Sequence, residues 1–547
     1  MPRDPDPATG ERTVDVLVIG SGAAGLSGAL AAAAGGLDVL VAEKSRYVGG
    51  TSAMSGGCAW VPCNHHMAKL GETDSPEEAL TYIRSVAPPG WADREDPLWR
   101  AFVRAAPEML RFVEDNSPLR FGVGLEPDAY AEAPGGKRRG RNVSPRPIAM
   151  RAAGPLAGRI RPTPALDSFT YNELADTQFM AHPVQGMLRY GLRSAWRKLT
   201  GQHAMGTALI VGLVRGCLDR GVDILLDAPA RELIVESERV VGARIEQEGK
   251  TRTIRARRGV LLATGGFEWS AEMMARYLPG PVELTGSPDT NTGDGHRMAE
   301  AVGAQLDRMD QSLIYPTKQI TYEGRPHGAP TKDLKLPHIM LVNKAGRRFV
   351  NEVQVNIGLA FEIRDPQSRQ PVNLPAWRIF DRQYARKYPH ALPAQRTPPL
   401  LYQADSLRAL AALIDVDPAG LEDSARRMSD FARRGRDDDF GRGTHIWDTL
   451  ILGDQAHRPN PVLGTIEQPP FYAVPFRASY LGTKGGPRTN EHGQVLRADG
   501  SRIAGLYAAG NVMANPIGSK AVGAGTTIGP VLAWGYICGR SLLKENA

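Results

Sequence analysis

Short apolar runs alternate with helical apolar patterns at both ends of the chain. Residues 14–19 and 38–43 are typical of buried strands, and the alanine-rich stretch between them has a helical pattern. Further strand patterns occur at residues 259–263 and within 499–512, and a last helical pattern begins near Thr526. Short apolar runs that end in glycine are typical of strands covered on both faces. The alternation therefore predicts an α/β fold.

The middle of the chain has a different character, with helix signals interrupted by prolines. Apolar residues at helical spacing in 409–428 indicate core rather than a docking surface. Because the strand signals of one type occur at both ends, we predict a Rossmann-like domain built from residues 1–282 and 453–547. Residues 283–452 are predicted to form an inserted α+β substrate (cap) domain.

The bulk composition is that of an ordinary globular protein. The apolar fraction is 42%, the charged fraction 23% and the formal net charge +7 over 547 residues. The basic runs at 135–141 and 255–258 lack interleaved aromatic residues, so nucleic-acid binding is not expected. The four cysteines form no disulfide framework or zinc pattern, which favours reduced thiols and a cytoplasmic location.

Neither targeting nor a metal site is indicated. Residues 1–13 lack the apolar core of a signal peptide and are expected to be a frayed leader. The most apolar stretch, residues 29–43, is interrupted by glycines and Asp38 before it reaches the ~20 residues of a membrane span. His65 and His66 are expected to point apart on a regular backbone, so no metal is predicted.

A glycine loop joins the first strand to the first helix. Gly20, Gly22 and Gly25 have the spacing GxGxxG, and Glu43 ends the second strand. In this context the glycines allow a tight turn, a close approach to pyrophosphate, and helix–strand packing, respectively. The helix start, with Ala23 and Ala24, then offers free N–H groups to the phosphates, and Glu43 accepts hydrogen bonds from an adenosine ribose. The loop predicts a dinucleotide cofactor.

A second small-residue loop favours FAD over NAD. It follows Glu43 and Lys44 directly and can run along a long extended cofactor, with its N–H groups and hydroxyls turned toward the phosphate, ribityl and ring. No second GxGxxG with strand and acid occurs, so no separate NAD(P)H domain is expected. The residues of this loop that we predict to contact the cofactor are Gly50, Thr51, Ser52, Ser55, Gly56 and Gly57.

These motifs, with ATGG at 263–266, NKAGRRFVNE at 343–352, LGTKGG at 481–486 and AAGN at 508–511, resemble the fumarate reductase and succinate dehydrogenase flavoprotein superfamily. The resemblance is stronger to its 3-ketosteroid dehydrogenase branch and extends over almost the whole chain. It implies FAD, which is expected to be noncovalent because no histidine occurs around residues 51–55. It adds these cofactor residues: Ala230, Thr264, Gly265, Gly266, Gly510, Asn511, Gly525, Thr526, Thr527 and Ile528.

In that branch tyrosines supply the base, its helper and one donor to the substrate carbonyl, and a glycine N–H supplies the other donor. Gly525 occupies the glycine position, but the resemblance places Ala521 and Asn356 where two of the tyrosines stand. Tyr130 lies near the helper position. Positioned acid and base groups are typically worth ~10²–10⁴ in rate, so replacements are expected. The candidates are Tyr315, Tyr480 and Lys520.

The sequence thus predicts an enzyme that moves a hydride between flavin N5 and a carbon beside an activating carbonyl, by desaturating a bulky, ketosteroid-like or polycyclic ketone. Open alternatives are an ene-reductase of the fumarate reductase type, a flavin oxidase, and a flavin-binding protein that has lost catalysis. The expected partners are a small carbonyl compound and an electron acceptor or donor, namely a quinone, O₂ or a redox protein. The expected state is a monomer or small homo-oligomer.

Overall fold

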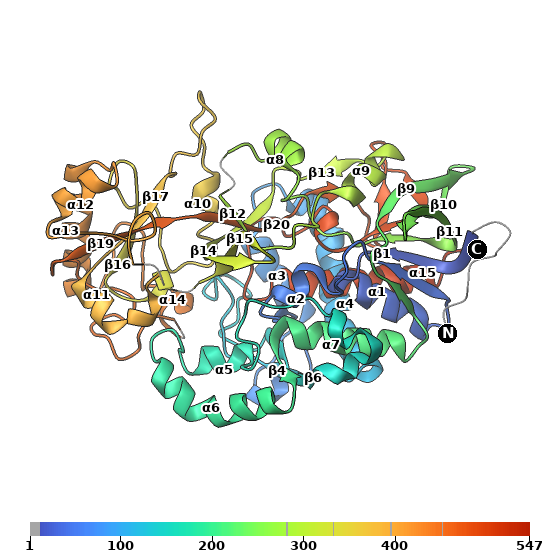
Figure 1. Ribbon diagram of the computed structural model, residues 1–547, viewed down its shortest axis with the longest axis horizontal. Coiled ribbons are helices and arrows are strands. Elements are labelled where there is room, and N and C mark those ends of the chain that lie inside the picture. Colours follow the sequence, from blue (N-terminus) through green and yellow to red (C-terminus); the bar gives the residue numbers. More distant parts are fainter. Residues whose placement is uncertain (1–10, 281–282, 332, 394–395, 451, 547) are drawn as a thin grey trace.

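The computed structural model describes residues 11–280, 283–331, 333–393, 396–450 and 452–546 (Figure 1). Of the frayed leader expected over residues 1–13, residues 1–10 lie outside the described residues. Residues 11–13 contradict the expectation, because they belong to the first strand, β1 (Glu11–Ile19). Within the described residues, no helix is long and apolar enough to cross a membrane.

The largest sheet joins strands from both ends of the chain. Its order is β22-β23-β10-β11-β1-β2-β8, and β9 pairs with β10. β1 runs parallel to β2 and β11, and β11 runs parallel to β23. Every strand predicted from the terminal patterns lies in this sheet, so that part of the prediction is confirmed. The strands are β1 (Glu11–Ile19), β2 (Val39–Ala42), β8 (Asp223–Leu225), β9 (Ala230–Glu236), β10 (Arg239–Gln247), β11 (Lys250–Leu262), β22 (Gln494–Leu496) and β23 (Arg502–Ala508).

Helices from both ends of the chain pack together beside this sheet, as Figure 1 shows for α1 and α15. Glycines bring these two helices into backbone contact: a Cβ on Gly535 would lie 2.2 Å from the Ala24 carbonyl oxygen, and one on Gly539 would lie 2.4 Å from that of Gly28. The last helix is therefore fixed against the helix that follows the glycine loop. The helices are α1 (Ala23–Ala34), α4 (Ala92–Asn116), α7 (Met205–Leu218) and α15 (Ile528–Leu542).

Two four-stranded sheets form most of the middle of the molecule. The first has the order β12-β20-β14-β15 and the second β16-β17-β19-β18. α12 and α13 cover the second sheet with Leu410, Leu421 and Met428, so the predicted core role of residues 409–428 is confirmed there. The elements are β12 (Leu284–Thr285), β14 (Ser312–Tyr322), β15 (Arg325–Pro330), β20 (Ala478–Thr483), β16 (Ile339–Asn343), β17 (Ala376–Asp381), β18 (Tyr402–Ala404), β19 (Phe471–Phe476), α12 (Leu407–Leu413) and α13 (Pro418–Arg434).

Smaller elements connect these layers. Three short sheets have the orders β3-β5-β4, β6-β7 and β13-β21. The strands are β3 (Ala59–Trp60), β4 (Phe121–Val123), β5 (Asn142–Pro145), β6 (Ile148–Ala149), β7 (Gln202–His203), β13 (Leu306–Asp307) and β21 (Gly486–Pro487). The remaining α-helices are α2 (Gly50–Met54), α3 (Pro76–Val86), α5 (Tyr171–Asp176), α6 (Pro183–Leu199), α8 (Ala271–Tyr277), α9 (Asp294–Ala301), α10 (Leu359–Glu362), α11 (Arg382–Lys387) and α14 (Ile446–Leu450).

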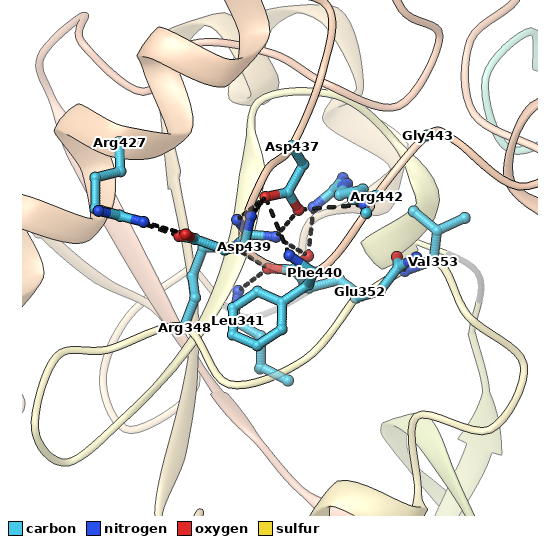
Figure 2. A network of polar contacts seen from close by, with 12 residues as sticks. Leu341, Arg348, Glu352, Val353, Arg427, Asp437, Asp439, Phe440, Arg442 and Gly443 are labelled. Atoms are coloured by element: carbon cyan, nitrogen blue, oxygen red, sulfur yellow. Dashed lines mark hydrogen bonds and ion pairs between the residues drawn. The ribbon is translucent and has the colours of Figure 1, made fainter.

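A buried ion network lies beside β16, and Figure 2 shows it at close range. Arg348 donates two hydrogen bonds of 2.9 Å to Glu352 and one of 2.9 Å to Asp437. Arg442 lies 3.1 Å from Glu352 and donates to the carbonyl oxygens of Ile339 and Leu336. Burial opposes ionisation of Glu352, but the charges of Arg348 and Arg442 outweigh it and lower the pKa of Glu352 to about 2. The network holds the segments around residues 339–352 and 437–442 together.

Candidate active site

An elongated cavity follows the glycine loop and the carboxyl ends of β1, β2 and β11. Its lining comes from both ends of the chain and from the middle, including β14, β15 and β20. Most residues that the sequence predicted for the cofactor line it, namely Gly20, Gly22, Ala23, Ala24, Glu43, Lys44, Gly50, Thr51, Ser52, Ser55, Gly56, Ala230, Thr264, Gly265, Gly510, Asn511, Thr527 and Ile528.

Five predicted cofactor residues lie outside this lining. Gly25 packs helix against loop, since a Cβ there would lie 2.0 Å from the Gly20 carbonyl oxygen. A Cβ on Gly57 would lie 2.4 Å from the backbone of Met205. The other three residues are Gly266, Gly525 and Thr526, and each of them is in close contact with neighbouring protein atoms.

Hydrogen bonds hold the glycine loop in shape. Gly20 has a φ of +107°, a conformation that favours glycine, and α1 begins without a side-chain cap. The Glu43 carboxylate accepts from the N–H and hydroxyl of Ser21 at 2.9 and 2.6 Å and from the N–H of Ser45 at 2.8 Å. Glu43 therefore fixes the loop, besides lying where a ribose hydroxyl would be recognised.

Sequence reasoning missed several lining residues that come from the middle of the chain. Asp294 forms an ion pair of 2.7 Å with Lys44, and Asn291 donates to Thr51 at 3.0 Å. Both lie in the motif NTGDGH, which resembled the superfamily without indicating which side chains face the cofactor. The other missed residues include Pro164, Met298, Leu313, Pro330, Leu481 and Lys484.

Lys484 is a buried cation in the cavity wall. Its ammonium group donates to the hydroxyl of Thr527 at 2.9 Å, directly before the first residue of α15. Burial lowers the pKa of Lys484 to about 8, although the nearby Glu268 carboxylate opposes the shift. The ammonium and the positive end of the helix dipole thus act at the same place, which favours an anionic group there.

Replacing Lys484 by methionine is expected to lower the two-electron midpoint potential of the flavin that the sequence predicts for this cavity. Removing a buried cation destabilises the anionic reduced form, by about 30–60 mV or about 1.4–2.8 kcal/mol. Spectroelectrochemistry on the purified holoprotein measures this midpoint potential. Since the pKa of Lys484 is about 8, the difference between the wild type and Lys484→Met should shrink above that pH.

The matched control is Lys318→Met, because Lys318 is a half-buried lysine of β14 outside the cavity lining. Equal potentials for the wild type and Lys484→Met at pH 7 would contradict the assignment.

The loop that contains Gly525 meets two other segments. The amide nitrogen of the Asn356 side chain donates to the Tyr130 hydroxyl at 2.9 Å and to the Ala521 carbonyl oxygen at 3.0 Å. The Ala521 N–H donates back to the Asn356 side-chain oxygen at 2.6 Å. Lys520 places its ammonium group 4.8 Å from the centre of the Tyr130 ring. The positions singled out by the family resemblance therefore form one cluster.

Gly525 is the glycine that the family resemblance assigns as a hydrogen-bond donor to the ligand. It has a φ of +85°, and its carbonyl oxygen accepts from the N–H of Trp60 at 3.0 Å and from that of Gly529 at 3.0 Å. Within the part of the chain that the structure describes, no protein group accepts the Gly525 N–H. This N–H group lies just before α15, where the helix dipole favours negative charge.

A second tyrosine lies against the cavity and was missed by sequence reasoning. A Cβ on Gly56, which lines the cavity, would lie 3.0 Å from the Tyr171 ring. The Tyr171 hydroxyl donates to the buried carboxylate of Glu126 at 2.7 Å. Burial first, then the charges of Glu126, Cys58 and Tyr315, raises the pKa of Tyr171 well above its ordinary value. Tyr171 is therefore a neutral phenol that is hydrogen-bonded to a proton acceptor, the Glu126 carboxylate.

The other candidate tyrosines occupy different environments. Tyr315 faces the Tyr171 group, and its strand neighbour Leu313 lines the cavity on the same face of β14. Tyr480 pairs with Ile314 across a bulge between β14 and β20 and packs in the hydrophobic core of the middle region. Tyr480 does not line the cavity, and the bulge instead turns Leu481 and Gly482 into it.

The prediction that His65 and His66 point apart is wrong. Their ring centres lie 4.0 Å apart, and both rings contact Glu114, at 2.8 and 3.0 Å. The chain turns here instead of following a regular strand or helix, so neighbouring side chains converge. The Lys69 ammonium donates to Nδ1 of His66 at 3.0 Å, so the other ring nitrogen of His66 carries the N–H that donates to Glu114. Hydrogen bonds to Glu114 and Lys69 hold this cluster together.

The cavity suits an extended anionic cofactor. The N-termini of α1 and α15 both lie in its lining, and helix N-termini stabilise negative charge. Thr264 and Asn511 also belong to the lining, and among the described residues the Thr264 hydroxyl and the Asn511 side-chain oxygen are buried without a hydrogen-bond partner. The glycine loop and the two helix N-termini are the features that would hold the phosphates.

Comparison with known proteins gives consistent matches over nearly the whole chain. A family model described as FAD binding domain matches residues 15–528. The 3-oxosteroid 1-dehydrogenase of Mycobacterium tuberculosis is 37% identical over 96% of this chain and 97% of its own length. The 4-oxocyclohexanecarboxylate 2-dehydrogenase of Sinomonas cyclohexanicum is 34% identical over 98% of this chain and 94% of its own length.

Solved structures agree with these matches. The 3-ketosteroid delta1-dehydrogenase from Sterolibacterium denitrificans, in complex with 1,4-androstadiene-3,17-dione, has a TM-score of 0.88 and 32% identity. That match covers 97% of this chain and 100% of the other. A flavocytochrome c3 fumarate reductase, at a TM-score of 0.63 and 22% identity, shares the fold.

The mixed α/β fold, the cavity and these matches define a flavin-dependent oxidoreductase that acts on CH–CH bonds. More particularly, the chain belongs to the FAD binding domain family, and its cofactor is FAD. The family resemblance and the cofactor predicted from the sequence are thereby confirmed.

Proposed function

We propose that this protein introduces a double bond beside the carbonyl of a cyclic ketone, with 3-oxosteroids as the leading substrate class. The observation that carries the proposal is the Tyr171–Glu126 pair against the flavin cavity, because it supplies proton transfer in a chain that has Ala521 and Asn356 at two tyrosine positions. The names of the relatives at 37% and 32% identity support the substrate class.

In this proposal two donors hold the substrate carbonyl. The first is the Gly525 N–H, and the second is the Tyr130 hydroxyl, which accepts from Asn356 and so keeps its own proton for another acceptor. Hydrogen bonds to the carbonyl oxygen stabilise the negative charge that develops there when a proton leaves the adjacent carbon. Asn356 acts as a positioning residue, because it ties Tyr130 to the backbone of the glycine loop.

The proton leaves through Tyr171. As the substrate's α C–H bond breaks, its proton passes to the Tyr171 oxygen while the phenolic proton passes to Glu126. FAD, held by the predicted residues that line the cavity, would supply the acceptor for the hydride of the neighbouring carbon. The substrate loses one proton and one hydride and gains a carbon–carbon double bond, so atoms and electrons balance. Tyr315 faces the same group and is assigned a supporting position there.

A second candidate substrate class is a cyclic ketone that carries a carboxylate. Lys520 is half-buried beside Tyr130 and forms no ion pair with a carboxylate of the described residues. A negatively charged substituent on the substrate would supply this counter-ion. The 34% identical relative is named for 4-oxocyclohexanecarboxylate, which is a ketone of this kind.

Anaerobic stopped-flow absorbance tests both classes. Oxidised holoprotein is mixed with a 3-oxosteroid saturated between C1 and C2, and separately with 4-oxocyclohexanecarboxylate. Bleaching of the flavin band, with a product two hydrogen atoms lighter, is expected with the steroid. Faster bleaching with the carboxylate selects the second class.

Other outcomes of the same experiment would overturn the proposal. The protein would be an ene-reductase if enones reoxidised the dye-reduced protein while no saturated ketone bleached the oxidised protein. If no saturated ketone bleaches the oxidised protein and no enone reoxidises the reduced protein, the protein is a flavin-binding protein without catalysis. Rapid reoxidation of the reduced protein by O₂ would support the oxidase alternative.

We further propose that the FAD domain is split between residues 1–282 and 453–547, with the cap at 283–452. The shared sheet of β1 and β23 supports the split, but β19 and β20 pair with strands of the middle region, which moves the second boundary toward residue 484. Noncovalent FAD, a cytoplasmic location, a quinone, O₂ or redox-protein electron partner, and a monomer or small homo-oligomer remain part of the proposal. The cofactor contacts proposed are those of the predicted residues that line the cavity.

A further inference from the structure

α6 presents an apolar face to the outside of the molecule. Figure 1 shows this helix at the outer edge, beside α5 and away from the central sheets. Leu188, Leu192 and Leu199 are 83%, 88% and 86% exposed, although leucines of a helix normally face the core. The exposed apolar face consists of Val184, Met187, Leu188, Leu192, Trp196 and Leu199.

The spacing of these residues makes one continuous face. Successive members are one, three or four positions apart, which places them on one side of a helix. The buried residues of α6 are Gly186, Ser194 and Arg197, which lie on the opposite side. The usual arrangement is thus reversed, because small and polar residues face the protein and large apolar residues face outward.

Specific contacts fix the rotation of α6. The Arg197 guanidinium forms two hydrogen bonds, of 2.6 and 2.8 Å, with the Glu173 carboxylate. The Ser194 hydroxyl donates to that of Ser168 at 2.8 Å, and a Cβ on Gly186 would lie 2.5 Å from the Phe179 ring. Rotating the helix to bury the leucines would break the buried ion pair, so the outward apolar face belongs to the folded state.

The charges that α6 itself carries beside this face are all positive. Arg189, Arg193 and Lys198 are exposed on its flanks, and residues 183–199 contain no aspartate or glutamate. Arg189 forms an ion pair of 3.1 Å with Asp176 of α5, whereas Arg193 and Lys198 have no carboxylate partner among the described residues. A helix with a large apolar face and flanking basic residues binds in the plane of an anionic membrane surface. We propose that α6 docks this protein onto anionic phospholipid, with its leucines and Trp196 inserted below the headgroups.

A second copy of the chain fits this surface less well. In a two-fold symmetric contact the same patch meets itself, so the arginines of one α6 would approach those of the other. Like charges brought together in an interface are unfavourable. Phospholipid phosphates offer the complementary charge and an apolar layer together.

The segment that carries α6 also reaches the active site. Pro164 lines the flavin cavity, and Tyr171, the first residue of α5, lies against Gly56. Docking through α6 would hold the cavity close to a bilayer, into which apolar ketones partition. The docking itself does not depend on the proposed substrate.

Vesicle flotation with purified holoprotein tests the inference. Wild type is expected to float with vesicles of phosphatidylcholine and phosphatidylglycerol, and to float less as salt rises. Leu188→Asp/Leu192→Asp is expected to reduce binding at least tenfold. The matched control Leu413→Asp replaces a leucine of α12 that is 55% exposed and should bind as wild type does.

A second variant examines the charges. Arg193→Gln/Lys198→Gln is expected to weaken binding to the anionic vesicles roughly twenty-fivefold, because each basic residue near such a surface contributes about fivefold. The flavin absorbance of each variant reports that it is folded. Failure of the wild type to float with anionic vesicles at low salt would overturn the inference. So would a solution dimer that the leucine variant converts to monomer, because a second copy would then cover the face.

Discussion

Replacing Tyr171 by phenylalanine is expected to slow reduction of the flavin by substrate about 10²–10⁴-fold, the usual contribution of a positioned acid–base group. The substitution removes only the hydroxyl, which donates to the Glu126 carboxylate at 2.7 Å. Substrate affinity should change little, because the proposed carbonyl donors are Gly525 and Tyr130. The rate constant of flavin bleaching under anaerobic single-turnover conditions measures the effect.

Glu126→Gln should cause a comparable loss, since it removes the proton acceptor, and the double variant should be little slower than either single variant. Tyr536→Phe is the matched control, because Tyr536 lies on α15 against Phe112 and outside the cavity lining. If Tyr130→Phe abolished bleaching while Tyr171→Phe left the rate unchanged, proton transfer would belong to Tyr130 and the relay would be wrong.

The second large effect is expected in the buried ion network of Figure 2. Glu352→Gln leaves Arg348 and Arg442 buried without their shared carboxylate, and breaking a buried pair costs about 3–5 kcal/mol of unfolding free energy. Chemical denaturation at pH 7, followed by tryptophan fluorescence, measures it. Glu422→Gln removes an exposed partner of Arg408 at 2.7 Å and should cost less than about 1 kcal/mol.

The same carboxylate predicts a pH dependence. The pKa of Glu352 is about 2 in the folded protein, against an ordinary value of 4.5. Because the folded pKa is lower, its stabilisation is complete above about pH 4.5 and is lost as the pH falls toward 2. The wild type should lose about 3 kcal/mol more than Glu352→Gln over that interval. An equal loss for the two proteins would show that Glu352 is not the group responsible.

Local sequence patterns predicted the part of the site that is contiguous in the chain. The turn at Gly20, the helix start after it and Glu43 all follow from one strand–loop–helix unit, whose geometry depends on neighbouring residues. The same holds for the strand signals at both ends, which do form one sheet. The position of the last helix beside the cavity followed from its glycine loop.

Residues that reach the site from elsewhere carried no such signal. Lys484 follows directly after β20, between Thr483 and Gly485, and only tertiary packing shows that it is buried beside Thr527. Tyr171 and Glu126 are 45 residues apart, so no local spacing could pair them. Tyr480 was a reasonable candidate by position, but a bulge in β20 directs its side chain into the core. Long-range pairing and irregular strand geometry account for both kinds of failure.

The contact between α1 and α15 has a consequence for biosynthesis. Thr527, Ile528 and Val531 form part of the flavin cavity, and β23 completes the sheet beneath it. A ribosome-bound chain that already displays the glycine loop therefore has an open half-site until β23 and α15 have been translated. Tight retention of FAD is then expected to follow the docking of α15 onto α1.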